Sequence, residues 1–404
     1  MKTDVTEEFI RRIPKTDLHV HLDGSLRLST LIEFAVEGHV ELPSYEEAGL
    51  KKTVFKSVYR NLPEYLRCFA YTCAVLQIPE NLERAAYELA EDNLAEGVRY
   101  IEVRFAPQLH VSEGREVKEV MRAVCRGLER AKARHAAAQA VLDGQDLPFE
   151  YGIIVCAMRS FNDRMGAYFA KLLRALPRAP RREVFAIASL EIVREAVELR
   201  DEESLPIVGF DLAGEEAGYP AAYHSAAYQY AHSHFMKKTV HAGEAYGPES
   251  IFQAITECHT NRIGHGTFLF SSDEIRARGV ADPERYVEAL ADYIASQRIT
   301  IEACLTSNLQ TIPRIRRVED HSLGQMLEHN MSVSICTDNR LVSNTTVTRE
   351  LGLVARHFAL SRHTFRNLVT AGFKGSFFPG SYRDKRACVR RVLDRYEALE
   401  QELL

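Results

Sequence analysis

The sequence predicts an α/β protein built as a (β/α)8 TIM barrel with additional helices. Eight short apolar segments alternate with helical segments along the chain. Chemically unusual polar residues fall at the carboxyl ends of several of these predicted strands. No break in composition and no Gly/Ser-rich linker divides the chain. Because the carboxyl ends of all strands meet at one mouth of such a barrel, these residues are expected to share one site.

Length and composition fit this prediction and exclude several classes of protein. The 404 residues are 46% hydrophobic, and single α/β barrels often run long, so we expect one domain over residues 1–404. A net charge of -5 does not indicate a protein that binds nucleic acid, because such binding normally requires a basic surface. No apolar segment approaches the roughly 20 residues of a membrane span, and the amino terminus does not resemble a signal peptide. The eight cysteines are scattered without a Cys-x-x-Cys pair, which favours reduced thiols and a cytoplasmic location.

The first predicted strand follows a polar lead-in over residues 1–15 and lies within Thr16–Ser25. Residues two apart in a strand point to the same side, so His19 and His21 present two imidazoles on one face. A helical insertion follows over about residues 30–97. One interpretation of this insertion is a mobile lid over the active site. The other, a static pair of surface helices, fits the pattern equally well.

The rest of the chain alternates between strands and helices until a helical tail over about residues 348–404. The further predicted strands cover 100–105, 151–156, 207–211, 238–241, 262–265, 299–303 and 332–337. The clearest predicted helices cover 30–36, 82–94, 116–134, 165–175, 185–199, 221–235, 249–257, 287–297, 323–330, 348–357 and 383–403. A doubly wound open sheet is the alternative. It would normally carry a Gly-rich phosphate loop after the first strand, where this chain has Leu22-Asp23-Gly24-Ser25.

Two histidines on one face of a strand make half of a zinc site, although either could be a core residue. His241 and Asp338 end two other predicted strands and complete a set of three nitrogens and one carboxylate. Bound zinc lowers the pKa of a water from about 15.7 to about 7. Related two-metal hydrolases often carry a bridging lysine after the fourth strand, where this chain has Asp211–Gly214. We therefore expect one Zn²⁺ per chain.

Two further residues have the chemistry of proton transfer. Glu244 lies three residues after His241, where a carboxylic acid suits proton transfer. The other interpretation of Glu244 is a carboxylate that orients His241. His265 lies between two glycines at the end of the sixth strand. Three roles fit this position: a fourth metal ligand, a general base, or a group that orients the metal-bound water.

Five motifs in order resemble those of the adenosine deaminase family. They are His19-Val-His-Leu-Asp-Gly-Ser25, Asp211-Leu-Ala-Gly-Glu215, His241-Ala-Gly-Glu244, Arg262-Ile-Gly-His-Gly266 and Thr337-Asp-Asn339. Each motif alone is weak, but five in order, spread over most of the chain from about residue 13 to 351, are very specific. The resemblance implies a (β/α)8 barrel with one zinc ion that removes the amino group of adenosine by hydrolysis.

The resemblance also implies roles for individual residues. Glu244 would protonate purine N1, and His265 would orient or deprotonate the zinc water. Asp23 would hold ribose hydroxyls, and the backbone N–H of Gly214 would meet purine N3. The expected metal ligands are His19, His21, His241 and Asp338. The expected catalytic residues are Glu244, His265 and Asp338, and the expected substrate contacts are His21, Asp23, Gly214 and Asn339.

Asn339 departs from the usual pattern of the family, in which a second aspartate occupies this place. The implied role of that position is to donate a hydrogen bond to purine N7. An aspartate must be protonated to donate, whereas an asparagine amide donates at any pH. The change therefore preserves donation but leaves the identity of the purine more open.

The leading hypothesis is deamination of free adenosine and 2′-deoxyadenosine. The alternative within the same chemistry is a modified adenine nucleoside, such as an aminofutalosine-like compound, 5′-methylthioadenosine or an N6-methyl nucleotide. Asp23 argues mildly against a 5′-phosphate, because the two groups repel each other. A single-metal phosphoesterase and an inactive ligand-binding relative are the hypotheses from other classes. A phosphoesterase should carry more histidines and basic residues at its strand ends than this chain does. Intact Glu244, His265 and Asp338 argue against an inactive relative.

Overall fold

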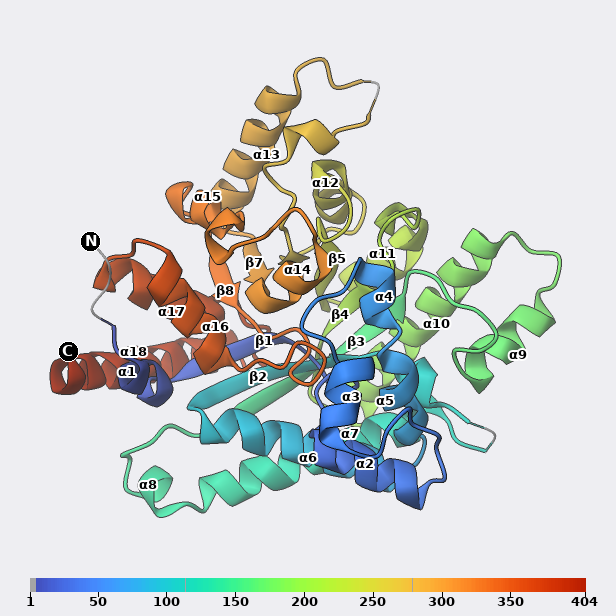
Figure 1. Ribbon diagram of the computed structural model, residues 1–404, viewed down its shortest axis with the longest axis horizontal. Helices are drawn as coiled ribbons and strands as arrows, with labels where there is room; N and C mark the ends of the chain where they lie inside the picture. The colour runs from blue at the N-terminus through green and yellow to red at the C-terminus, as the bar shows by residue number, and fades with distance from the viewer. Residues whose placement is uncertain (1–4, 113, 278) are drawn as a thin grey trace.

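The computed structural model describes residues 5–112, 114–277 and 279–404 and shows eight parallel strands in a nearly closed barrel (Figure 1). The strands follow one another around the barrel in chain order. Their bounds are β1 Lys15–His21, β2 Val98–Phe105, β3 Glu150–Met158, β4 Ile207–Ala213, β5 Lys237–Ala242, β6 Arg262–His265, β7 Thr300–Ala303 and β8 Val333–Ile335. All eight predicted strands lie where they were expected, and the predicted fold class is confirmed.

The barrel closes where the chain leaving β8 returns beside β1. The backbone N–H of Asp338 donates to the carbonyl of His19, and the N–H of His21 donates to the carbonyl of Asp338, both at 2.8 Å. Asp338 itself has a left-handed backbone, with φ of 61°. Non-glycine residues adopt this conformation only where the surroundings compensate for its cost. These backbone hydrogen bonds alone place the candidate site residues His19, His21 and Asp338 side by side.

Helices surround the barrel on its outer side (Figure 1). The connections between strands and the tail contain α6 Pro79–Ala95, α7 Val117–Ala136, α8 Gln139–Leu142, α9 Ala167–Ala175, α10 Arg181–Glu202, α11 Ser225–Ser233, α12 Pro248–Thr256, α13 Pro283–Gln297, α14 Leu305–Thr311, α15 Leu323–Glu328, α16 Val347–His357, α17 Arg362–Gly375 and α18 Tyr382–Leu403. A side chain at Gly127 of α7 would overlap the backbone of α6 at Glu83, so the glycine permits close packing of these helices.

The insertion after β1 consists of short helices that begin the route from β1 to β2. They are α2 Leu28–Glu37, α3 Glu47–Thr53, α4 Leu62–Leu66 and α5 Phe69–Val75. Asn61 caps α4 because its side chain accepts from the N–H of Glu64, and a proline follows in the first turn. The N–H of Tyr59 donates to the carbonyl of Gln310 at 2.9 Å, which fastens the insertion to α14.

Three α-helices, α1, α8 and α14, lie where none was predicted from the sequence. The lead-in contains α1 Glu7–Arg12, and Arg12 forms an ion pair at 2.8 Å with Glu402 of α18, so the two ends of the described chain meet. The segment after β7 contains α14, whose polar sequence lacks a helical apolar repeat. None of the described helices is long and apolar enough to cross a membrane.

Candidate active site

The structure brings His19, His21, His241 and Asp338 together at the carboxyl end of the barrel. Nε2 of His241 lies 3.0 Å from Nε2 of His19 and 3.1 Å from Nε2 of His21. Oδ1 of Asp338 lies 3.5 Å from Nε2 of both His19 and His21. One ligand atom from each residue lies within 4.8 Å of all the others, and all four residues are buried. This cluster could hold a metal ion.

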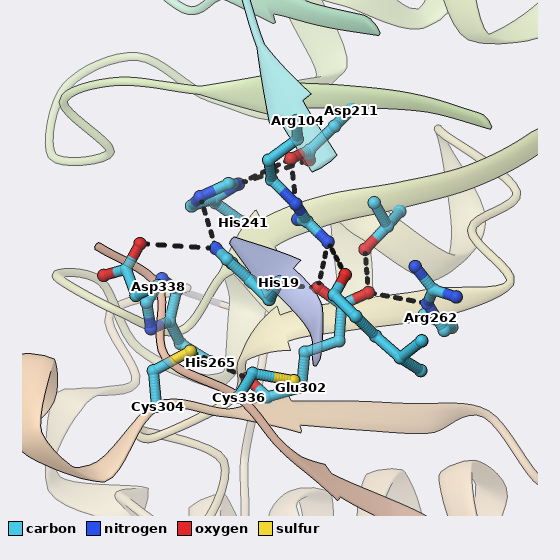
Figure 2. Close-up of polar contacts among 12 residues, drawn as sticks. His19, Arg104, Asp211, His241, Arg262, His265, Glu302, Cys304, Cys336 and Asp338 are labelled. Atoms are coloured by element: carbon cyan, nitrogen blue, oxygen red, sulfur yellow. Dashed lines mark hydrogen bonds and ion pairs between the residues drawn. The ribbon is translucent and has the colours of Figure 1, made fainter. Parts of the chain in front are cut away.

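Buried carboxylates fix the direction of two of these imidazoles (Figure 2). Glu302 of β7 lies 2.9 Å from Nδ1 of His19, and Asp211 of β4 lies 3.0 Å from Nδ1 of His241. Burial alone would raise the pKa of both carboxyls, but neighbouring positive groups lower it well below its usual range. Each ionised carboxylate therefore accepts the Nδ1 proton, which leaves the Nε2 lone pairs facing into the cluster.

Facing lone pairs at about 3.0 Å repel each other unless a cation lies between them. A cation that accepts electron pairs from both nitrogens removes this repulsion, and the carboxylate of Asp338 adds opposite charge. Ser307 holds that carboxylate in place by donating to its Oδ2 at 2.6 Å. The donor set therefore fits the zinc ion expected from the sequence.

A network of buried charges holds these carboxylates in place (Figure 2). The Arg104 guanidinium of β2 donates to Asp211 and to Glu302, each at 2.9 Å. Arg262 of β6 donates to the other oxygen of Glu302 at 2.6 Å and forms an ion pair with Glu102. These charges lie on four strands, β2, β4, β6 and β7, and hold the two imidazoles of β1 and β5, so the barrel strands themselves fix the ligand geometry.

Glu244 lies on the loop after β5, and its position depends on a second carboxylate. Glu216 accepts hydrogen bonds from the backbone N–H groups of residues 243–246 and from the hydroxyl of Ser250. Burial and the charge of Asp338 raise the pKa of the Glu244 carboxyl well above its usual value. This shift favours the protonated carboxyl, which is the form that a general acid requires.

His265 of β6 contacts a relay of hydrogen bonds that fixes its tautomer. The N–H of Leu323 donates to Nδ1 of His321, so Nε2 of His321 carries a proton and donates to Oδ1 of Asn308 at 3.1 Å. The Thr267 hydroxyl also donates to this oxygen. The amide nitrogen of Asn308 then donates to Nδ1 of His265 at 3.1 Å.

Because Nδ1 of His265 accepts, a neutral His265 carries its proton on Nε2. That nitrogen lies 3.6 Å from Oε1 of Glu244 and has no hydrogen-bond partner among the described residues. A protonated Nε2 can donate a hydrogen bond, but it cannot coordinate a metal. The relay therefore favours the orienting role for His265 over the ligand role.

The remaining predicted residues line a cavity of about 770 Å³ in front of the cluster. Asp23, Gly214 and Asn339 reach it from the loops after β1, β4 and β8, and residues of α4 and α5 form the opposite wall. The amide nitrogen of Asn339 donates at 2.8 Å to the hydroxyl of Tyr65 on α4. A side chain at Gly24 would overlap the Asn339 amide, so a glycine is required there.

The residues that hold the side chains of the site in place were not predicted from the sequence. Glu302, Arg104 and Asn308 gave one usable signal, which is a charged or amide residue next to apolar residues in a segment expected to be buried. Tyr65 gave no signal, because its partner Asn339 is 274 positions away.

Comparisons with known proteins agree with these motifs. A sequence model of a family described as adenosine deaminase matches residues 14–394. A protein named adenosine deaminase from Mycolicibacterium vanbaalenii is 35% identical over 403 residues, covering 99% of each chain. One of the same name from Mycobacterium leprae is 34% identical over 388 residues, covering 95% of each. The solved N6-methyl-AMP deaminase from Arabidopsis thaliana is 25% identical with a TM-score of 0.71, covering 96% of this chain and 98% of that one.

Proposed function

This chain belongs to the adenosine deaminase family, whose members are hydrolases acting on the amino group of a purine, and we propose that it converts adenosine and 2′-deoxyadenosine to inosine and 2′-deoxyinosine. Water supplies the new C6 oxygen, and ammonia leaves. The observation that carries the proposal is the convergence of the four-residue cluster, Glu244 and His265 at one end of one cavity. The cytoplasmic location expected from the sequence is part of the same proposal.

In this proposal His19, His21, His241 and Asp338 hold one zinc ion. Zinc at this place would supply hydroxide at neutral pH by lowering the pKa of a coordinated water to about 7. Glu302 and Asp211 keep two of the imidazoles in the tautomer that zinc requires. Imidazole nitrogen and carboxylate oxygen together suit zinc better than magnesium or calcium, which prefer sets of oxygen ligands.

Glu244 and His265 divide the proton chemistry between them. Glu244 retains its proton because it is buried, and gives it to purine N1 as C6 is attacked. The N1–C6 double bond can then accept the attacking oxygen without charge building up on the ring. His265, which carries its proton on Nε2, donates a hydrogen bond that orients the attacking oxygen.

The loops after β1, β4 and β8 hold the nucleoside. Asp23 accepts hydrogen bonds from ribose hydroxyls, and the backbone N–H of Gly214 meets purine N3. Asn339 uses one N–H of its amide to bond Tyr65, which leaves its second N–H for purine N7. His21, which lines the cavity as well as the metal cluster, contributes to the same surface.

A second candidate is a larger adenine nucleoside. The cavity of about 770 Å³ lies in the upper part of the roughly 300–1,000 Å³ typical of ligand pockets, so it has room beyond a nucleoside. Arg67 and Arg164 line its outer part and would attract an anionic substituent. The Arabidopsis relative is named for a methylated nucleotide, which is a substrate of this kind. The phosphoesterase hypothesis finds no support, because the family acts on purine amino groups.

The test is a panel of substrates with purified protein, followed by the loss of adenine absorbance in the ultraviolet. Adenosine and 2′-deoxyadenosine should give the highest kcat/KM, above AMP, N6-methyl-AMP and 5′-methylthioadenosine. A preference for one of the last three would replace the first candidate by the second. No turnover of any adenine compound by the metal-loaded protein would contradict both.

A further inference from the structure

A second group of ligand-type side chains lies in the wall of the same cavity. Asp23 follows β1, Cys73 lies on α5, and His110 ends the short 3₁₀ helix Pro107–His110 after β2. Oδ2 of Asp23 lies 3.9 Å from Sγ of Cys73 and 3.9 Å from Nε2 of His110. One ligand atom from each residue lies within 4.8 Å of the other two. None of these atoms belongs to the cluster at the barrel end.

The tautomer of His110 is fixed in favour of a metal ligand. Its Nδ1 lies 3.1 Å from the backbone carbonyl of Leu76, and a carbonyl can only accept, so Nδ1 carries the proton. Nε2 of a neutral His110 therefore presents a lone pair toward Asp23. The His110 side chain is fully buried, and Nε2 has no hydrogen-bond partner among the described residues.

Asp23 adds a second buried acceptor at the same point. Its Oδ1 also lacks a partner within the described part of the chain, and only 3% of the residue is exposed. Burying the unpaired Nε2 of His110 and this carboxylate without full pairing carries a desolvation cost, and a cation bound between the two residues would reduce it. The neighbouring thiol offers one weak donor, its S–H, to the other oxygen of Asp23.

From this geometry we propose that Asp23, Cys73 and His110 form a second metal site, for a divalent cation of the zinc type. A thiolate, an imidazole and a carboxylate are ligands that zinc and cobalt accept, whereas magnesium and calcium prefer sets of oxygens. On binding, the thiol proton passes to solvent as the sulfur–metal bond forms. Asp23 and Cys73 line the cavity, so the ion can enter from there, with a further coordination position open to water.

Metal in this site would inhibit the enzyme, and this consequence rests on the proposed function. An ion on Asp23 would occupy the part of the cavity wall where ribose binds and would withdraw one carboxylate oxygen from the ribose hydroxyls. Excess zinc should therefore raise KM for adenosine without changing kcat, because the catalytic cluster keeps its own ion. The competing interpretation is that these side chains contact only the nucleoside and bind no metal.

The test is a titration of the zinc-loaded protein with Co²⁺, followed by absorbance in the near ultraviolet. A bond between thiolate and cobalt gives a charge-transfer band there, and the cluster at the barrel end contains no cysteine. We expect this band to saturate at one Co²⁺ per chain. Absence of the band in the parent protein would overturn the proposal.

Two variants test proposed ligands, and a third serves as the control. Cys73→Ser should abolish the band. His110→Asn should keep the bond to the Leu76 carbonyl through its amide but lose Nε2, so Co²⁺ affinity should fall by more than the roughly 10–100-fold typical of an outer hydrogen-bond partner. Cys68→Ser is the control, because the Cys68 thiol donates to the Val54 carbonyl in the same insertion. A band that survives Cys73→Ser, or unchanged affinity in His110→Asn, would refute the site.

The band does not depend on turnover, so the two proposals can fail separately. A protein that shows the band but leaves every adenine nucleoside unchanged would support the second site and refute the proposed function. An active enzyme without the band would do the reverse. Zinc inhibition of equal strength in the parent and in His110→Asn would contradict the inhibitory role of the site.

Discussion

On the barrel side of the cavity, Glu302 contacts His19, two arginines and a threonine, all within 3.0 Å. On the loops that line the cavity after β1 and β8, buried oxygens of Asp23 and Asn339 lack any hydrogen-bond partner among the described residues. The first set of contacts, around Glu302, is complete before a ligand arrives, as catalytic geometry requires. The second is incomplete until a ligand supplies donors. From this difference we expect the barrel strands to fix the geometry of the metal ligands, and the loops with the insertion to recognise the substrate.

The largest expected effect comes from Glu244. Glu244→Gln keeps the shape of the side chain but cannot supply the proton to N1. General acid catalysis alone is typically worth roughly 10²–10⁴-fold, and addition to an unprotonated ring should cost more. Turnover should therefore fall by several orders of magnitude, while zinc content and nucleoside binding remain. Turnover within tenfold of the parent would show that Glu244 only orients its neighbours.

The next effect tests whether the barrel side depends on its buried charges. Glu302→Gln removes the negative charge that Arg104 and Arg262 share and leaves each guanidinium with one carboxylate, Asp211 or Glu102. Breaking buried pairs typically costs up to roughly 3–5 kcal/mol of unfolding free energy. Zinc affinity should also fall roughly 10–100-fold. Urea unfolding and competition with a chelator measure the two quantities.

A matched control exists on the surface, where His357 and Glu319 form an exposed pair of the same chemistry at 2.7 Å. Glu319→Gln should change stability little, because exposed ion pairs are screened by solvent. Equal effects of the two substitutions would show that the charges behind His19 have no special part in the site.

A smaller effect concerns pH and the relay behind His265. Burial lowers the pKa of His321 to about 4, below the roughly 6.5 of an unfolded chain. The unfolded state therefore binds more protons between these values. The contribution of His321 to the free energy of unfolding is fully present above about pH 6.5 and is lost as the pH falls toward about 4. The loss of unfolding free energy from this group between pH 7 and pH 5 should be about 2 kcal/mol.

His321→Gln removes this titration and can still donate to Asn308. Urea unfolding at pH 7 and pH 5 should show a loss of stability on acidification that is smaller in the variant by about 2 kcal/mol. An equal loss in the parent and in the variant would mean that His321 is already charged in the folded protein, and the tautomer deduced for His265 would then lack its basis.

The smallest effect lies on the recognition side, at Tyr65. Tyr65→Phe removes the group that holds the Asn339 amide, and one hydrogen bond contributes a net of roughly 0.5–1.5 kcal/mol. The kcat/KM for adenosine should fall by about 2–12-fold. For 7-deazaadenosine, which lacks the N7 acceptor, kcat/KM should change less. An equal fall with both substrates would show that Asn339 does not meet N7.

The barrel could be predicted from the sequence because its strands are short apolar runs, and their carboxyl ends share one mouth whatever the details of packing. That rule was enough to group His241 and Asp338 with His19. It could not assign Glu302 to His19 or Asn308 to His265, because such pairs depend on which side chains meet across the barrel. The role of Tyr65 could not be predicted for the same reason, because its partners Ser343 and Asn339 are distant in the sequence.

The central claim is that one metal ion in the barrel-end cluster enables the removal of the adenine amino group. Its most direct test is a joint measurement of metal content and adenosine turnover in the parent protein and in His19→Ala. The parent should carry about one tightly held zinc per chain, lose activity on chelation and regain it with one equivalent of zinc. His19→Ala should lose both metal and activity. Full activity in metal-free protein, or a need for two metal ions per chain, would contradict the claim.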